Sequence, residues 1–278
     1  VAAGLFNPVT GKRVVKTWKA DEIFPFADTF YEDIQSLLKT KIQHKRNTYR
    51  LFKDTADLND IISKAYEPKF SNYINPEFNS EEIDSNLNNS LGGIEILRSG
   101  HIDVSTYLQV FKSYLMDKNI FLEREINDSV WTIKNNSLSL KGISFEKIIF
   151  CEGFRAIYNP LFNWLPFSVT KGEMLKIRTP FSDKYIINKG FFLVPTKEKN
   201  EFWVGSSYER VEDENVSEKG RSIVTEKLDD FFKDGYEIID QKAAVRPTVR
   251  DRRPFIGQHP EIKNTCIFNG MGTKGITL

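Results

Sequence analysis

The apolar pattern of the chain changes near Phe167, and this change restricts the possible folds more than any other feature of the sequence. After Phe167, polar and apolar residues alternate along four segments, as they do in strands that cover one side of a core. These segments are residues 173–177, 185–194, 202–206 and 237–245. With one helix expected at about 218–232, this half of the chain predicts an antiparallel sheet with one covered face.

The residues before Phe167 have a different, α/β character. Apolar residues recur at three-and-four spacing from Asp21 to about Ile42, which predicts an amphipathic helix. Asp103 is placed to cap a second helix that runs to about residue 117. The β-branched and aromatic run at 147–150 predicts a strand that is buried on both faces.

Several shorter elements complete the expected secondary structure. The polar segment 54–90 is expected to pass over the surface, with helical turns near 57–65 and a turn at 68–70. Short strands are expected at 49–53, 93–98, 120–122, 130–133, 138–140 and 266–268.

These elements predict an α/β fold with α+β character, in which two domains are interleaved along the chain. The α/β part would contain the two helices before Phe167, the strand at 147–150 and the strand near Cys266. We expect one domain from residues 1–48, 97–155 and 246–278, and the other, with the antiparallel sheet, from residues 49–96 and 156–245.

Charge and cysteine content exclude several classes of function. The 39 basic and 38 acidic residues leave a net charge of +1, so the composition does not favour a nucleic-acid or anionic-lipid partner. Cys151 and Cys266 lie in apolar runs and are expected to be buried, free thiols in a reducing, cytoplasmic compartment. No apolar stretch approaches the roughly 20 residues that a membrane-spanning helix needs.

A glycine-rich string of the form G-x-G-x-x-G follows the strand expected near Cys266. It reads Gly270-Met271-Gly272-Thr273-Lys274-Gly275. A dinucleotide fingerprint also needs a complete helix, a returning strand and an acidic residue about 20 positions on, and the chain ends at Leu278. The string therefore predicts either a plain turn or backbone N–H groups at a helix start, which attract negative charge on a ligand.

An arginine-rich segment at residues 246–257 lies between two expected strands. Such a cluster is either a solvated loop with an arginine–aspartate pair or a place where one arginine faces a cavity. In the second case, the planar guanidinium can hold a substrate carboxylate through two parallel hydrogen bonds.

Other catalytic patterns find no support in the sequence. His44, His101 and His259 are scattered without cysteine or carboxylate at ligand spacing, so no metal site is expected. No serine lies in a G-x-S-x-G elbow, which argues against a serine hydrolase. Tyr208 is either a substrate-facing phenol or an aromatic residue at the end of a strand.

Taken in order, four segments resemble the flavin-dependent amine oxidoreductases of the D-amino-acid oxidase, glycine oxidase and sarcosine oxidase superfamily. They are Ala2-Ala3-Gly4-Leu5-Phe6-Asn7-Pro8, Gly100-His101-Ile102-Asp103, Ile148-Ile149-Phe150-Cys151-Glu152-Gly153, and the run from Arg246 through Gly275. The resemblance implies FAD as cofactor, a partial FAD-binding, Rossmann-like domain, and a substrate-binding domain built on the antiparallel sheet.

The resemblance also assigns site residues. Ala3 and Gly4 would lie beside the flavin, Gly153 near the adenosine side of the cofactor, and Gly257 close to it. The backbone of the glycine string would face the pyrimidine edge of the isoalloxazine ring through Gly270, Gly272, Thr273, Lys274 and Gly275. Arg246 would bind the substrate carboxylate, and a second family arginine is replaced here by Thr273 or Lys274.

The implied reaction is hydride transfer from an amine-bearing carbon to the flavin, followed by hydrolysis of the imine. The flavin performs the chemistry, so no catalytic acid–base pair is expected from the protein. Two alternatives remain: a flavin oxidase-like protein that modifies a uridine in transfer RNA, and a catalytically silent interaction module.

Both ends of the sequence resemble cuts in a longer protein. The chain begins at Val1 without a methionine or a signal-peptide layout, and it stops at Leu278 in mid-pattern. Family members start with a βαβ unit that holds the FAD pyrophosphate, and the expected missing segment is about 30 residues or more.

Overall fold

The structure is a computed structural model, and it describes residues 3–11, 14–79, 85–88, 91–126, 131–134, 137–140 and 143–278. Ala2, Val130 and parts of the polar segment 54–90 lie outside the described residues. The helices are α1 (Ala20–Leu38), α2 (Thr55–Ala65), α3 (Val104–Asp117) and α4 (Glu218–Asp229), with short 3-10 helices η1 (Pro68–Phe70) and η2 (Gly153–Tyr158).

The strands divide between the two halves of the sequence. Before Phe167 they are β1 (Leu5–Phe6), β2 (Val9–Thr10), β3 (Val15–Lys16), β4 (Gln43–Lys45), β5 (Thr48–Leu51), β6 (Ile74–Asn79), β7 (Gly93–Ile96), β8 (Gly100–Ile102), β9 (Trp131–Lys134), β10 (Ser137–Leu140), β11 (Ile143–Ser144) and β12 (Ile148–Phe150). After it they are β13 (Thr170–Arg178), β14 (Ile186–Asn188), β15 (Phe192–Pro195), β16 (Glu201–Gly205), β17 (Glu237–Arg246), β18 (Phe255–Gln258) and β19 (Thr265–Asn269).

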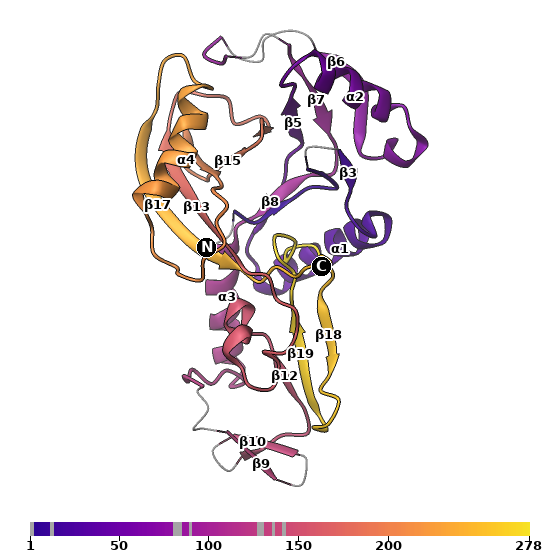
Figure 1. Cartoon of the computed structure of the whole chain (residues 1–278), viewed down its shortest axis with the longest axis vertical. Helices are drawn as coiled ribbons and strands as arrows, with labels where there is room; N and C mark the ends of the chain where they lie inside the picture. The colour runs from indigo at the N-terminus through magenta and orange to yellow at the C-terminus, as the bar shows by residue number, and fades with distance from the viewer. Residues whose placement is uncertain are drawn as a thin grey trace.

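An eight-stranded sheet dominates the molecule, in the order β17-β13-β16-β15-β14-β5-β7-β6. Its neighbouring strands are antiparallel except for the parallel pair β14 and β5. In Figure 1 this sheet occupies the upper part of the view, with β17 on one side and β6 on the other. The sheet thus joins strands from both halves of the chain, and the proposed division into two domains stays a prediction.

A second sheet has the order β12-β19-β18 and lies in the lower part of Figure 1. β12 and β19 are parallel, whereas β18 returns antiparallel to β19. Parallel strands joined by a long crossover are typical of α/β folds. Together with the large antiparallel sheet, this pair confirms the predicted fold class.

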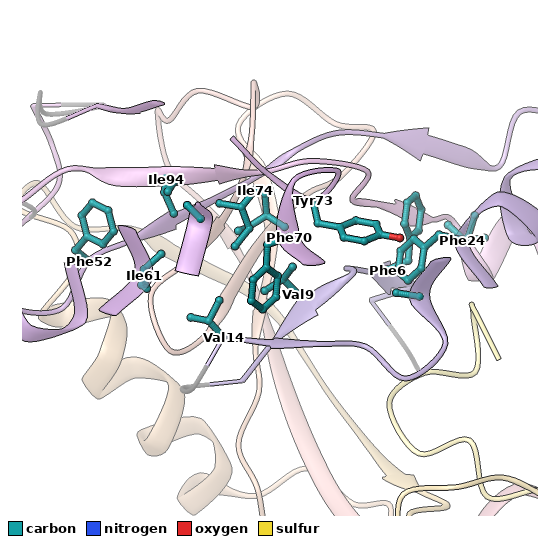
Figure 2. Close-up of a cluster of buried hydrophobic side chains, with 14 of the residues drawn as sticks. Phe6, Val9, Val14, Phe24, Phe52, Ile61, Phe70, Tyr73, Ile74 and Ile94 are labelled. Carbon is teal, nitrogen blue, oxygen red and sulfur yellow. The ribbon is translucent and has the colours of Figure 1, made fainter. Parts of the chain in front are cut away.

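Three groups of buried apolar residues form the core. The first joins the N-terminal segment to α1, α2 and β6, and includes Phe6, Phe24, Ile61 and Tyr73 (Figure 2). The second fills the space between the large sheet and α4, around Leu175, Val204 and Leu228. The third packs beside β12 and β19, around Phe150, Phe162 and Ile267. Each part of the fold is therefore held by its own group of buried apolar side chains.

Local signals fix the helix ends. The Asp103 carboxylate accepts a hydrogen bond from the Thr106 backbone N–H at 3.0 Å and caps α3, as predicted. The Ser217 hydroxyl caps α4 in the same way, accepting from the Gly220 N–H. α1 follows the predicted pattern but ends at Leu38 rather than near Ile42, because Lys39 adopts a left-handed conformation.

The prediction of a surface excursion at 54–90 was wrong for the described part of that segment. The helical turns expected near 57–65 and the turn expected at 68–70 are present, as α2 and η1, and the segment also supplies β6. It does not pass over the surface, because Ile61, Phe70, Tyr73 and Ile74 are buried (Figure 2). These few apolar side chains lie on one face of each element, and that face packs against the core. In the sequence they are separated by many polar residues, so the buried face could not be recognised.

Two further predictions about strands need correction. The expected strand at 185–194 is the hairpin β14–β15, because Gly190, with φ of 77°, turns the chain. No strand forms at 120–122, where the chain is exposed and irregular. The arginine-rich segment ends in β18, and of the two alternatives for the glycine string the structure shows turns rather than a helix start.

The expected burial of β12 and of the cysteines was also wrong in part. Among the described strands β12 pairs only with β19, and Ile149 is 56 % exposed. Cys151 directly follows this edge strand and is exposed, while Cys266 on the central strand is partly buried, and both thiols are free. None of the helices in the described ranges is long and apolar enough to cross a bilayer.

Candidate functional site

The glycine turn at residues 270–275 directly follows β19. Gly270 and Gly272 have φ of 78° and 56°, a conformation that other residues adopt only with strain. A side chain at Gly272 would lie 3.1 Å from the Thr248 methyl group. The Gly272 N–H donates to the Pro247 carbonyl at 3.2 Å, so the turn is fastened to the chain just after Arg246.

Lys274 fastens the same turn to the N-terminal segment. Its ammonium donates to the Asn7 carbonyl at 3.1 Å and to the Thr17 hydroxyl at 3.4 Å. Among the described residues no carboxylate pairs with it, and burial lowers its pKa from 10.5 to about 8. The turn therefore carries a partly buried positive charge that no described carboxylate compensates.

The start of the described chain packs closely against β8. Gly4 has φ of 66°, and its carbonyl accepts from the Ile102 N–H at 2.9 Å. A Cβ at Gly4 would lie 1.9 Å from the Ile102 carbonyl oxygen, so only glycine fits there. The alanine–glycine segment and the G-H-I-D motif, which the resemblance singled out separately, are thus neighbours in space.

Asn269 links the ends of the two parallel strands. Its side-chain amide donates to the Gly153 carbonyl at 2.8 Å, and its carbonyl oxygen accepts from the Gly270 N–H at 2.7 Å. Gly153 has φ of 60° and begins η2 directly after β12. Two segments about 116 positions apart in sequence therefore meet beside the glycine turn.

Arg246 ends β17 at the edge of the large sheet. Its Nη1 donates to the Lys171 carbonyl at 3.2 Å and its Nη2 to the Ser206 hydroxyl at 2.5 Å. In the described ranges it forms no ion pair with a carboxylate. Burial lowers the pKa of this guanidinium, opposed by a smaller effect of the nearby Tyr208. A partly buried cation without a counter-charge is a suitable site for an anionic group.

The remaining predicted site residues lie at different distances from Arg246 and the glycine turn. Tyr208 lies near Arg246 and is 65 % exposed, and Thr273 and Gly275 lie exposed in the turn. Ala3 precedes Gly4 and is partly buried. Gly257 lies further along β18, opposite Ile267, with open space around it, and is not brought to the turn.

Sequence analysis missed the residues that hold these groups together. Asn7, Thr17 and Asn269 support the glycine turn, and Gly172 and Ser206 contact the Arg246 guanidinium. One signal was available for Asn269, which stands directly before the glycine string at the end of a strand. The others depend on contacts between distant segments, which no local pattern reveals.

The rest of the described surface offers no comparable site. A surface groove of about 690 Å³ runs along the end of α1 and β4, beside Glu32, Lys39 and Lys45. It contains none of the predicted site residues, and its lining is that of a solvated, charged surface. Within the described ranges, no three histidine, cysteine, aspartate or glutamate side chains gather in a cluster that could hold a metal ion.

Comparison with known proteins agrees with the resemblance in the sequence. The model of the family described as FAD dependent oxidoreductase matches residues 2–278. The match thus includes the N-terminal segment, Arg246 and the glycine turn.

Solved structures with the same fold are enzymes of related kinds. Iminodiacetate oxidase from Chelativorans sp. BNC1 superposes with a TM-score of 0.83 at 16 % identity, over 99 % of this chain and 81 % of that one. Glycine oxidase from Geobacillus kaustophilus gives 0.79 at 18 % identity, over 100 % and 80 %. L-proline dehydrogenase from P. horikoshii gives 0.75 at 14 % identity, over 96 % and 77 %. At these identities the likeness concerns the fold.

Proposed function

The chain belongs to the family of FAD-dependent oxidoreductases, and we propose that it oxidises a small amine or amino acid whose carboxylate is held by Arg246. The observation that carries this proposal is the uncompensated Arg246 guanidinium beside the fastened glycine turn. Structural relatives named for iminodiacetate, glycine and L-proline support the same substrate class.

The residues of the glycine turn fit a flavin. The absent side chains at Gly270 and Gly272 let the turn pack against Val249 and Thr248, which supports a fixed backbone for a flat ring to bind against. Lys274 adds a partly buried positive charge, which suits the electron-rich edge of a reduced isoalloxazine. We infer that the backbone of Gly270, Gly272, Thr273, Lys274 and Gly275 holds this edge, with Ala3 and Gly4 beside the ring and Gly153 toward the adenosine.

Bound FAD would accept a hydride from the amine-bearing carbon of the substrate. The protein would supply orientation and electrostatics. Arg246 would fix the carboxylate, so that the neighbouring C–H bond keeps one direction relative to the glycine turn. The exposed phenol of Tyr208 and the side chain of Thr273 would contact the remainder of the substrate.

The proposal is tested by loading the protein with FAD and adding substrates without oxygen. Glycine, iminodiacetate and L-proline are compared with ethylamine, which lacks a carboxylate, and loss of the oxidised flavin absorbance is followed. We expect reduction by at least one carboxylate-bearing amine. Arg246→Ala should raise its KM about 100-fold, as expected for loss of a charge-assisted, two-bond contact.

Arg253→Ala is the matched control, because Arg253 is an exposed arginine of the same segment that stacks on Trp18, 4.6 Å from the ring centre. It should leave KM unchanged. Equal KM values for the Arg246 variant and the unchanged protein would refute the assignment of Arg246. Failure of every amine to reduce the flavin would refute the oxidase proposal and favour a silent interaction module.

A further inference from the structure

The Arg246 guanidinium lies in a gap on one face of the large sheet, which we call the notch, bounded by Gly172 and Ser206. The proposed function does not explain why this gap is present. Arg246 pairs with Thr170 across β17 and β13, and Gly172 is two residues further along β13, on the same face. A Cβ at Gly172 would lie 1.8 Å from Nη2 and 2.3 Å from Cζ of Arg246. The guanidinium therefore occupies the volume that a side chain at residue 172 would fill.

Ser206 closes the other side of this notch. It follows β16, which pairs with β13 on the edge opposite β17. The Arg246 side chain thus crosses β13, and its Nη2 reaches the Ser206 hydroxyl at 2.5 Å while Nη1 reaches the Lys171 carbonyl. Two of its five N–H groups are held by the sheet, and the guanidinium plane is fixed by contacts on neighbouring strands.

The opposite face of β13 is closed and cannot receive a ligand. Lys171 and Glu173 are 3 % and 0 % exposed there and form an ion pair at 3.3 Å. The Glu173 carboxylate also accepts from the Ser217 hydroxyl and the Gln241 amide, which fixes it against the start of α4. The absence of a side chain at Gly172 therefore serves the face that carries Arg246.

We propose that Gly172 and Ser206 are positioning residues that hold the Arg246 guanidinium in the orientation required to bind a substrate carboxylate. This inference rests on the proposed function of Arg246. It extends that function to Gly172 and Ser206. We assign neither residue a contact with substrate or flavin, and both act only through Arg246.

The test uses Gly172→Ala and Ser206→Ala in the FAD-loaded protein, with a readout that does not require turnover. Acetate binding is measured by NMR titration, beside KM and kcat for the carboxylate-bearing amine. We expect each variant to weaken acetate binding and raise KM about tenfold, the effect of one charged hydrogen bond, with a smaller change in kcat. Ser206→Thr retains the hydroxyl and should restore acetate binding to within about twofold of the unchanged protein.

Ser207→Ala is the matched control. The Ser207 hydroxyl accepts from the Glu173 N–H, so its loss affects the closed face of β13. This variant should lower the melting temperature and leave acetate binding unchanged. An effect of equal size on acetate binding in the Ser207 and Ser206 variants would overturn the proposal, because it would show a general loss of structure.

The outcomes separate this inference from the proposed function. If Arg246→Ala abolishes acetate binding but Gly172→Ala and Ser206→Ala bind as tightly as the unchanged protein, the positioning role is wrong and the function of Arg246 stands. If the unchanged protein binds no acetate, both are wrong. If Gly172→Ala does not fold, the alanine and threonine variants of Ser206 decide the question.

Discussion

Replacement of Lys274 by methionine should make the apo-protein more stable, because this partly buried lysine has no counter-charge among the described residues. Burial lowers its pKa from 10.5 to about 8. The difference between these two pKa values corresponds to about 3 kcal/mol, which the charge subtracts from the free energy of unfolding at neutral pH. Loss of its hydrogen bonds to Asn7 and Thr17 offsets about 1 kcal/mol each, so the net gain at pH 7 should be about 1 kcal/mol.

The pH dependence gives a sharper test of the same reasoning. Below pH 8 Lys274 is protonated in both the folded and the unfolded state. Between about pH 8 and 10.5 the folded state has released the proton while the unfolded state retains it, so the unchanged protein becomes more stable as pH rises. Lys274→Met lacks this titration, and its advantage should shrink and reverse, by a total of about 3 kcal/mol.

The assay is urea unfolding at pH 7, 8, 9 and 10, followed by tryptophan fluorescence. Other groups titrate in this range, so the quantity compared is the difference in unfolding free energy between variant and unchanged protein at each pH. Lys263→Met is the control, because Lys263 is exposed between β18 and β19, and its difference should be constant. A constant difference for Lys274→Met as well would refute the assignment of a buried, uncompensated charge.

Four further variants test three separate contacts. His101 stacks on His44 at 4.8 Å between ring centres, and its pKa is lowered to about 4, mainly by burial and also by the charge of His44. The free energy of unfolding should therefore fall by up to about 3 kcal/mol as pH falls from 6.5 to 4. His101→Asn should remove this contribution in urea titrations. Tyr31 donates to the Ile276 carbonyl at 2.8 Å, so Tyr31→Phe should speed amide hydrogen exchange in residues 270–278 several-fold without affecting α4. Gly4→Ala places a Cβ 1.9 Å from the Ile102 carbonyl oxygen and should prevent stable folding. The new Cβ of Gly153→Ala meets open space, so this variant should lower the free energy of unfolding by only about 1 kcal/mol. Thermal unfolding measures both. Similar melting temperatures for the two glycine variants would contradict the close approach at Gly4.

The elements with strong local signals were predictable from the sequence. The three-and-four spacing of α1 and the Asp103 cap of α3 fixed the position of both helices to within a few residues. The alternating strands β13, β16 and β17 follow the pattern after Phe167, because their side chains face two different environments. These features depend only on residues close together in the chain.

Features that depend on distant contacts could not be predicted in this way. Helical turns were expected where α2 forms, but the burial of α2 and the strand β6 were not, because both carry mostly polar residues. Their few buried side chains reach a core only when the N-terminal segment packs on them. Residues 255–258 form the strand β18 because they pair with the edge of β19. The position of Arg246 depends on an absent side chain at Gly172 and a hydroxyl at Ser206, 74 and 40 positions away.

The candidate site shows the same division. The glycine string and Arg246 were recognisable by residue type, and the resemblance to a family set them in a common context. Their fastening through Pro247, Asn7 and Asn269 required the structure. Backbone carbonyls provide two of these three contacts. Because every residue has a backbone carbonyl, the residue types do not indicate which positions make these contacts.

The most direct test of the account is hydrogen exchange, measured by mass spectrometry, of the protein with and without FAD. We predict that FAD slows exchange at residues 270–275, in the segment that begins at Ala3, and in η2 after Gly153, and leaves α4 unchanged. Binding of FAD without protection of residues 270–275, or no binding at all, would contradict the assignment of this turn to the flavin.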